Sequence, residues 1–296
     1  MMHLENYSKN WVGKSAIRLA RRTLPISLKV AIWKLITATR LRSGTILGRY
    51  RCSVCNNRVS RFDPLPPDAV THNFKYSTDQ AEMCNAANYS CPRCGAPDRE
   101  RLYALYLREY FDTIARECPG SNVIKFVDFA PSISLSSFIK RRIANSPCAF
   151  CYRTADLFRD DVDDKVDIMD MKVYGDESVD FFLCSHVLEH VADDKRALSE
   201  LYRILKRGGR GILVVPIVLA ALEIDEDPSL TDVAERWRRF GQDDHVRLYS
   251  REGFLMRVAQ AGFTVRQLGQ EHFGADTFSV QGITERSILY VVEKDL

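Results

Sequence analysis

The chain has 296 residues, of which 46% are hydrophobic and 27% are charged. This composition excludes a disordered chain as the default and leaves room for one α/β domain with a smaller unit beside it. The net charge of +3 is too small by itself to indicate nucleic-acid binding. No apolar run is long enough to span a bilayer, and the first residues lack the layout of a secretory signal, so we expect a cytoplasmic protein.

Residues 1–50 predict a basic, amphipathic helical segment. Up to Arg51, Glu5 is the only acidic residue, and apolar side chains such as Trp11 and Leu19 alternate with lysines and arginines. Such a segment can dock its apolar side on a neighbouring domain, which we favour, or lie on an anionic membrane surface. The second alternative would make the protein peripheral to a membrane.

Two Cys-x-x-Cys pairs lie within residues 51–100, which we expect to form a zinc-ribbon module. The four cysteines are Cys52, Cys55, Cys91 and Cys94. Four thiolates close a tetrahedral zinc site and leave no position for water, so the ion would be structural. Asn56 and Gly95 each follow a pair, where a knuckle needs a residue that tolerates positive φ. The alternative is four unrelated buried thiols, because the 35 residues between the pairs exceed the common spacing.

A connecting helix is predicted within residues 101–121, and strands then alternate with helices from residue 122 to residue 296. We expect strands at 123–129, 149–152, 166–168, 179–184 and 211–215, helices at 132–143, 193–205 and 251–261, and a closing strand pair at 263–268 and 287–292. Alternation of this kind is typical of a parallel sheet with helices on both faces. The fold class is therefore α/β.

The strongest functional signal lies between Asp167 and Pro216. It contains Ser178-Val-Asp-Phe-Phe-Leu-Cys-Ser-His-Val-Leu-Glu-His-Val, then Arg203-Ile-Leu-Lys-Arg-Gly-Gly, and a strand that ends at Pro216. This ordered run resembles the class I S-adenosylmethionine (SAM)-dependent methyltransferases of the broad type-11 group. The resemblance covers residues 122–293. It implies a Rossmann-like sheet of seven strands, mostly parallel with an antiparallel last strand.

Three further features resemble a narrower bacterial subgroup in which a zinc ribbon precedes the methyltransferase fold. They are the two cysteine pairs, an Ala-Pro loop after the first strand, and the phrase from Gly241 to Tyr249. The loop after the first strand, Ala130-Pro-Ser-Ile-Ser, contains no glycine, although glycines there usually let the backbone approach the cofactor. Whether such a loop still admits SAM stays open from the sequence.

The candidate cofactor residues follow the strands of the predicted sheet. They are Asp128, Ala130, Pro131, Asp156, Asp167 and Ser185. Open parallel sheets bind ligands at the carboxyl ends of their strands, where the strand order reverses. A carboxylate at Asp156 could accept both ribose hydroxyls, and the resemblance implies that Asp167 contacts the adenine amino group. Each acid could instead be a helix cap or a solvated turn.

Three histidines are the candidate catalytic residues: His186, His190 and His245. Methyl transfer requires an oriented acceptor and removal of its proton, and histidine suits the second task because its pKa lies near neutrality. We expect His190 to lie one helical turn after His186, so that both share a face. The alternative for His190 and Glu189 is that they only brace this helix.

The predicted function is methylation. The family resemblance implies, more closely, O-methylation of a small metabolite or a glycan-type acceptor. Residues 217–239 form a long connection after the fifth strand and are a candidate acceptor lid. A rival interpretation is a non-catalytic binding protein that keeps the methyltransferase fold, which the glycine-free loop favours. RNA methylation ranks lower, and a nucleic-acid partner is not expected, because the ribbon has few interleaved aromatic and basic residues.

Overall fold

The computed structural model describes residues 48–66, 74–117 and 123–296. The predicted basic segment therefore lies outside the described residues, apart from its last three positions. Within the described ranges, no helix combines the length and apolar character that crossing a membrane requires. Residues 46–296 form one compact unit.

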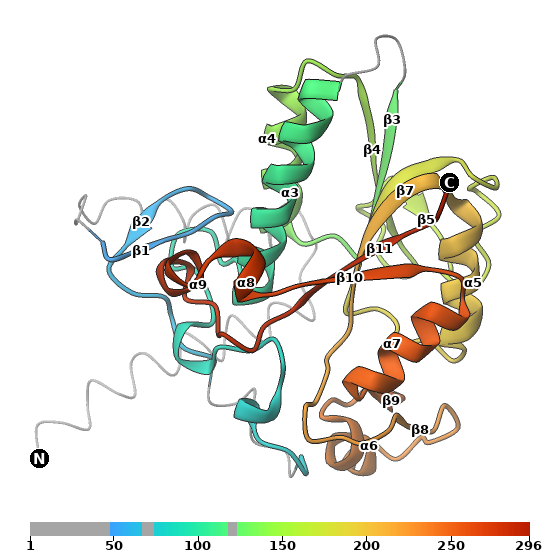
Figure 1. Cartoon of the computed structure of the whole chain (residues 1–296). Coiled ribbons are helices and arrows are strands. Elements are labelled where there is room, and N and C mark those ends of the chain that lie inside the picture. Colours follow the sequence, from blue (N-terminus) through green and yellow to red (C-terminus); the bar gives the residue numbers. More distant parts are fainter. Residues whose placement is uncertain (1–47, 67–73, 118–122) are drawn as a thin grey trace, which may run out of the picture. The chain divides into compact units, whose positions relative to one another are not determined.

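A seven-stranded sheet forms the centre of this unit (Figure 1). Its strands are β3 (Ile124–Phe129), β4 (Phe150–Asp156), β5 (Asp164–Lys165), β6 (Val179–Ser185), β7 (Leu205–Val214), β10 (Thr264–Leu268) and β11 (Leu289–Glu293). Their order is β10-β11-β7-β6-β3-β4-β5. Strands β3 to β7 run parallel, and β11 runs antiparallel to both of its neighbours. The predicted Rossmann-like methyltransferase sheet is confirmed.

Helices cover both faces of the sheet because successive side chains of its strands point to opposite faces. Phe126 and Phe181 pack in the core that includes α3 (Asp98–Glu117) and α4 (Ile133–Ala144). Their neighbours Val127 and Phe182 pack in the second core, with α5 (Asp194–Ile204) and α7 (Arg251–Gln260). These strands read as continuous apolar runs in the sequence because both of their faces are buried.

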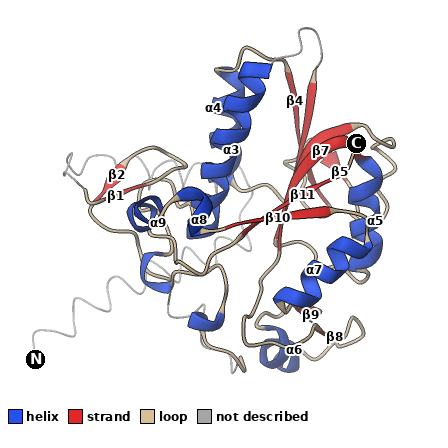
Figure 2. Ribbon diagram, viewed as in Figure 1, coloured by secondary structure: helices blue, strands red, loops and turns tan. Residues whose placement is uncertain are grey.

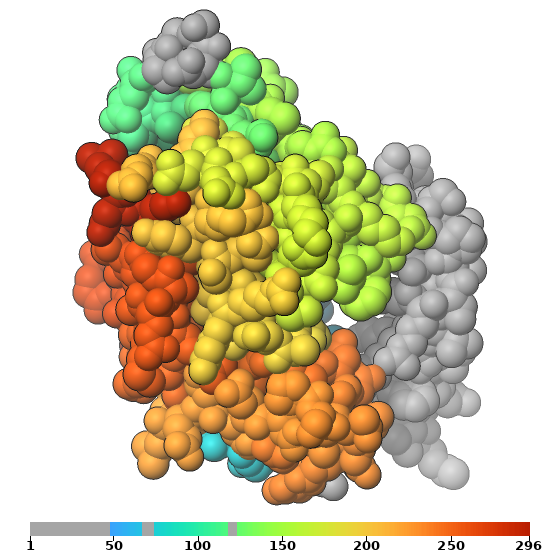
Figure 3. All heavy atoms as spheres, turned by 90° about the vertical axis from the view of Figure 1, so that its right-hand side faces the viewer, coloured from blue at the N-terminus to red at the C-terminus, as the bar shows by residue number. Residues whose placement is uncertain are grey.

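Shorter elements flank the sheet (Figure 2). The N-terminal module holds β1 (Tyr50–Arg51), β2 (Arg58–Val59) and the 3-10 helices η2 (Thr78–Gln80) and η3 (Ala86–Asn88). An insert between β7 and α7 holds β8 (Asp225–Glu226), α6 (Val233–Phe240) and β9 (Arg247–Leu248), and α8 (Gln270–Phe273) and α9 (Ala275–Gln281) separate β10 from β11. In the space-filling view the orange insert lies directly below the gold surface around α5 (Figure 3).

Two predicted boundaries are wrong. The strand expected at 211–215 begins at Leu205, directly after α5 ends at Ile204. The reason is a register shift between β6 and β7, which lets Gly208 adopt φ 70° inside the strand. The third strand lies at residues 164–165 and not at 166–168, because a bidentate ion pair to Arg153 from β4 holds Asp164 in this strand.

Arg101 ties the N-terminal module to the C-terminal part of the domain. Its guanidinium is fully buried and lies 3.8 Å from the centre of the Phe62 ring. It donates hydrogen bonds to the backbone carbonyls of Asn88, Tyr89, Ala96, Gln281 and Gly282. The Ser53 amide also donates to Gln281 Oε1 at 2.7 Å. Five carbonyls from two distant stretches of sequence therefore share one buried cation.

Candidate functional site

Parallel strands bring the candidate cofactor residues to one edge of the sheet. Asp128 is the second-last residue of β3, and Ala130 and Pro131 follow that strand. Asp156 is the last residue of β4, Asp167 follows β5, and Ser185 is the last residue of β6. Strand β3 pairs in parallel with both β4 and β6, so the carboxyl ends of these strands meet. The strand order reverses at β3 and β6, which is where such sheets bind ligands.

Asp128 is a buried carboxylate, and one of its two oxygens accepts no hydrogen bond from the described residues. Its Oδ2 accepts hydrogen bonds from Tyr152 Oη at 2.6 Å and from Ser136 Oγ at 3.0 Å. Its Oδ1 has no hydrogen-bond partner among the described residues. Burial raises the pKa of Asp128 to about 6, against the opposing effect of the Tyr152 and Ser136 hydrogen bonds. Such an orphaned oxygen is suited to a cationic ligand.

The loop after β3 has an alanine in a backbone conformation that usually requires glycine. Ala130 adopts φ 51°, a left-handed conformation that costs a non-glycine residue about 1–2 kcal/mol. Its amide donates to the Ala155 carbonyl at 2.8 Å, and Ser132 then caps α4 by accepting from the Leu135 amide. Backbone strain of this kind gathers at functional sites.

Asp156 and Asp167 each stabilise the turn that follows their strand. Asp156 Oδ1 accepts from the amides of Phe158 and Arg159 at 2.8 and 3.0 Å. Asp167 Oδ1 accepts from the Met169 amide at 2.8 Å. Both acids therefore have the turn role that the sequence left open as an alternative. This role fixes the carboxylates in place and engages Oδ1 of each, so a ligand role for them stays a prediction.

The first turns of α3 add three residues that the sequence interpretation missed. Tyr103 Oη lies 2.9 Å from Ser185 Oγ, and Glu100 accepts a hydrogen bond from Ser134 in the first turn of α4. Arg99 lies close enough to lower the pKa of His186, after burial the largest cause of that shift. These residues looked like part of a connecting helix. The available signal was the charged run at residues 98–101, which continues directly into an apolar helix.

The three histidines gather around Glu189. His186 Nδ1 lies 3.3 Å and His190 Nε2 lies 3.8 Å from Glu189 Oε1. The rings of His190 and His245 have centroids 4.7 Å apart and are nearly perpendicular. The helix expected to carry His186 and His190 is wrong, since α5 begins only at Asp194. His186 adopts φ 57°, so the chain leaves β6 in a turn, and the side chains meet there.

The four groups differ in their protonation behaviour. Burial lowers the pKa of His186 and of His245, so both are neutral near pH 7. Burial also disfavours the charge on His190, but the Asp244 and Glu189 carboxylates outweigh it and raise its pKa. Burial opposes the charge on Glu189, yet the three histidines lower its pKa. A neutral His186 beside strand β6 has the form that a proton acceptor needs.

Arg247 clamps the turn that carries Glu189 and His190. Its guanidinium is buried and donates to the carbonyls of Leu188, Val191 and Ala192. It also pairs with Glu226 at 3.2 Å, and the Val246 amide donates to the Glu189 carbonyl at 2.9 Å. The phrase from Gly241 to Tyr249 in the sequence thus holds the histidine turn against the insert.

Replacing Arg247 with methionine is expected to lower the free energy of unfolding by about 3–5 kcal/mol, because three carbonyls and Glu226 lose a buried donor. Urea denaturation followed by circular dichroism measures the change. Arg238→Met is the matched control, since the Arg238 side chain is exposed and, among the described residues, forms an ion pair with Glu235 alone; it should cost less than about 1 kcal/mol. Equal losses for both variants would contradict the clamp.

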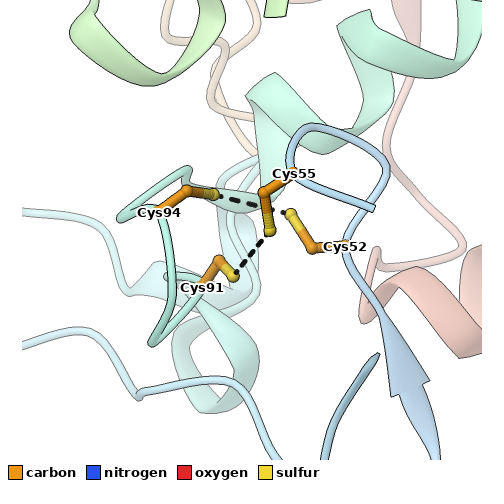
Figure 4. A group of neighbouring side chains, drawn as sticks. All are labelled: Cys52, Cys55, Cys91 and Cys94. Carbon is orange, nitrogen blue, oxygen red and sulfur yellow. Dashed lines mark hydrogen bonds between the residues drawn. The ribbon is translucent and has the colours of Figure 1, made fainter. Parts of the chain in front are cut away.

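The four predicted zinc ligands come together as the spacing indicated (Figure 4). The Sγ atoms of Cys52 and Cys94 lie 3.7 Å apart, and those of Cys55 and Cys91 lie 3.9 Å apart. A tetrahedral zinc with Zn–S bonds of about 2.3 Å needs S···S distances of about 3.8 Å. The sulfur geometry therefore fits the ion.

Both knuckles have the same backbone hydrogen bonds. Asn56 donates to the Cys52 carbonyl, and Gly95 donates to the Cys91 carbonyl. The return bonds run from the Cys52 amide to Asn57 and from the Cys91 amide to Ala96. As predicted, Asn56 and Gly95 have positive φ, at 62° and 77°. Two equivalent turns place four sulfur atoms around one point, which favours a shared metal site over four unrelated buried thiols.

Residues 153–213 match the protein family described as a methyltransferase domain. A curated relative, an uncharacterized methyltransferase of Bacillus subtilis (strain 168), is 30% identical over 98 residues. That alignment covers 33% of this chain and 34% of the relative, so the chain spans about a third of that relative's length.

Solved structures with similar coordinates include the CurJ carbon methyltransferase, with 16% identity, a TM-score of 0.42, and coverage of 67% of this chain and 58% of that chain. The Haemonchus contortus phosphoethanolamine N-methyltransferase 2 has 11% identity, a TM-score of 0.38, and coverage of 64% and 53%. The strand order is that of the Rossmann-like methyltransferase fold, and residues 153–213 within this sheet match the methyltransferase domain family.

Proposed function

We propose that the protein is a SAM-dependent methyltransferase that methylates a hydroxyl group of a small metabolite or glycan-type acceptor. The observation that carries the proposal is the orphaned, buried Asp128 oxygen at the same sheet edge as a neutral, partly buried His186. Bound SAM would supply an electrophilic methyl group on a sulfonium centre. The residues at this edge then have to bind a cation, orient an acceptor and accept a proton.

Each candidate residue has a role in this proposal. Asp128 holds the cationic methionine portion of SAM, with Ala130 and Pro131 shaping the loop beside it. Asp156 accepts the ribose hydroxyls, and Asp167 takes the adenine amino group, as the family resemblance implies. Ser185, held by Tyr103 at 2.9 Å, lines the side of the methyl group. His186 takes the acceptor's proton, while His190 and His245 belong to the acceptor side of the site.

Zinc is the second part of the proposal. The four cysteines within residues 51–100 would hold one structural Zn²⁺, and the equivalent knuckles and sulfur distances support it. The last cysteine lies only four residues before α3, so an ordered knuckle fixes where Arg99, Glu100 and Tyr103 enter the site. The residues up to about 100 would then be a module that shapes the methyltransferase domain of residues 122–296.

Calorimetric titration of the full chain with SAM and with S-adenosylhomocysteine tests the proposal. We expect binding with a micromolar dissociation constant, weakened at least about fivefold in Asp156→Asn, which keeps the turn but loses a charged acceptor. Asp160→Asn is the matched control, because Asp160 is exposed in the same loop and its ion pair within the described part of the chain is with Lys165.

The rival is a non-catalytic binding protein, which the glycine-free loop favours. Absence of heat with both nucleosides at millimolar concentration, from a folded chain, would favour it. If SAM binds, release of S-adenosylhomocysteine upon addition of hydroxyl-bearing sugars would identify the acceptor class. No turnover with any acceptor, despite tight binding, would leave the protein a SAM-binding module and would contradict the enzyme.

A further inference from the structure

Glu189 is a fully buried carboxylate without a hydrogen bond. Its side chain is 0% exposed, and neither Oε1 nor Oε2 accepts a hydrogen bond among the described residues, although two histidine nitrogens lie within 3.8 Å. A buried carboxylate costs several kcal/mol unless neighbouring charges, hydrogen bonds or a metal ion compensate it. Buried acids of this kind are kept in proteins when they pair with a charge or bind a metal ion.

Two histidines beside Glu189 are held in the form that binds metals. His245 Nδ1 lies 3.1 Å from the Phe240 carbonyl, and His190 Nδ1 lies 3.4 Å from Asp244 Oδ2. A proton on each Nδ1 satisfies these oxygens and leaves both Nε2 lone pairs free. An imidazole whose second nitrogen is held by a carbonyl or carboxylate is the usual arrangement of a metal-ligating histidine.

The three donor atoms are close enough to share one ion. Glu189, His190 and His245 each offer an atom, and these atoms lie within 4.8 Å of one another. Atoms this close all lie within about 2.8 Å of a common point, so a movement of at most about 0.6–0.8 Å per ligand brings them to coordination distances of about 2.0–2.2 Å. Changes of this size need only small side-chain rotations.

We propose that Glu189, His190 and His245 form a second metal site, which binds a divalent first-row cation through two imidazole nitrogens and one carboxylate. Two histidines and one carboxylate leave coordination positions open, unlike the four-thiolate site. The mixed nitrogen and oxygen donors favour Mn²⁺, Fe²⁺ or Zn²⁺, whereas the thiolates select Zn²⁺. The ion is chemically distinct from the structural zinc.

The consequence for catalysis rests on the proposed function. Glu189 and His190 follow β6, at the sheet edge where His186 lies, and His245 lies in the insert, just before β9. A cation there could bind one or two hydroxyl oxygens of the acceptor and lower their pKa, which would ease the transfer of a proton to His186. The acceptor class that fits best is therefore a compound with neighbouring hydroxyl groups, such as a sugar or a catechol.

Mn²⁺ titration followed by electron paramagnetic resonance tests the site without SAM and without turnover. The full chain, with its structural zinc retained, should remove the signal of about one free Mn²⁺ per chain, because thiolates do not compete for this ion. Glu189→Gln and His245→Asn should each weaken binding by about 10–100-fold or more. His272→Asn is the matched control, since His272 pairs with Glu109 away from this cluster.

Each outcome decides the proposal. Loss of binding in the two site variants, with normal circular dichroism and normal binding in His272→Asn, supports it. Failure of the folded wild-type chain to bind Mn²⁺ below about 1 mM overturns it, and so does equal binding by wild type and Glu189→Gln. If a site variant does not fold, His190→Gln and Asp244→Asn replace it in the same titration. Since SAM is absent throughout, this result is independent of whether the chain binds SAM.

Discussion

Replacing Cys52 with serine is expected to release the zinc and to lower the affinity for SAM at least about tenfold. Structural zinc contributes on the order of 10 kcal/mol to the order of small modules, so the knuckles should lose their fold without it. Helix α3 begins just after the second knuckle, and Arg101 fixes that knuckle to the C-terminal part of the domain. Glu100 and Tyr103 would then no longer be held at the cofactor edge.

Metal analysis, differential scanning calorimetry and SAM titration measure these three effects. We expect the zinc content to fall from one ion per chain to none, and the melting temperature to fall by about 10 °C or more. Cys84→Ser is the matched control, because Cys84 is a partly buried cysteine outside the four-sulfur cluster. A Cys52→Ser chain with wild-type SAM affinity would show that the module does not position α3.

Replacing Asp128 with asparagine is expected to abolish the pH dependence of SAM binding and to weaken binding at neutral pH. The pKa of Asp128 lies at about 6 in the folded chain. A cationic ligand prefers the ionised carboxylate, so wild-type affinity should rise about tenfold between about pH 5 and 7, as ionisation proceeds. Asparagine keeps an acceptor for Tyr152 and Ser136 but carries no charge. Titration calorimetry at several pH values gives the profile.

The same substitution should stabilise the chain when SAM is absent. The pKa of Asp128 is higher in the folded state than its ordinary value of 3.8, so the native state retains the proton while the unfolded chain ionises. Stability is therefore unaffected below about pH 4, falls as the pH rises to about 6, and then stays constant. Removing this penalty at pH 7 should raise the unfolding free energy by on the order of 1–3 kcal/mol.

Opposite effects on stability and on binding would mark Asp128 as a ligand-binding residue and not as part of the fold. Asp180→Asn serves as a control, since Asp180 lies on β6 and its carboxylate pairs with Lys206 and the Lys125 amide. That variant should leave the pH profile of SAM binding unchanged. A pH-independent wild-type affinity between about pH 5 and 7 would contradict the role of Asp128.

Much of the fold could be predicted because its sheet is buried on both faces. Strands such as β3 and β6 read as apolar runs, and α5 and α7 show apolar stripes that end near a turn residue. The start of β7 could not be predicted, because the residues at 205–210 look like the end of a helix. Their strand character comes from pairing with β6, which is a tertiary effect.

The candidate site was partly predictable for a similar reason. Acids and histidines that follow strands gather at one edge by the geometry of a parallel sheet. Arg247 and Tyr103 were missed as site residues because their partners are backbone carbonyls and a serine hydroxyl, which leave no pattern in the sequence. The histidine turn was predicted to be helical because the spacing of His186 and His190 suits a helix, but the left-handed conformation of His186 interrupts it.

The hydrogen bonds of Arg101 have a consequence for biosynthesis. The guanidinium and the Ser53 amide take their acceptors from Gln281 and Gly282, near the end of the chain. A ribosome delivers these acceptors more than 170 positions after Arg101 itself. The cysteine turns could therefore bind a metal ion early, but their docking must await translation of Gln281 and Gly282, and a nascent chain stopped before α9 would leave a buried cation partly unsolvated. The N-terminal module therefore reaches its final position only when the rest of the domain has folded, and not when its own turns form.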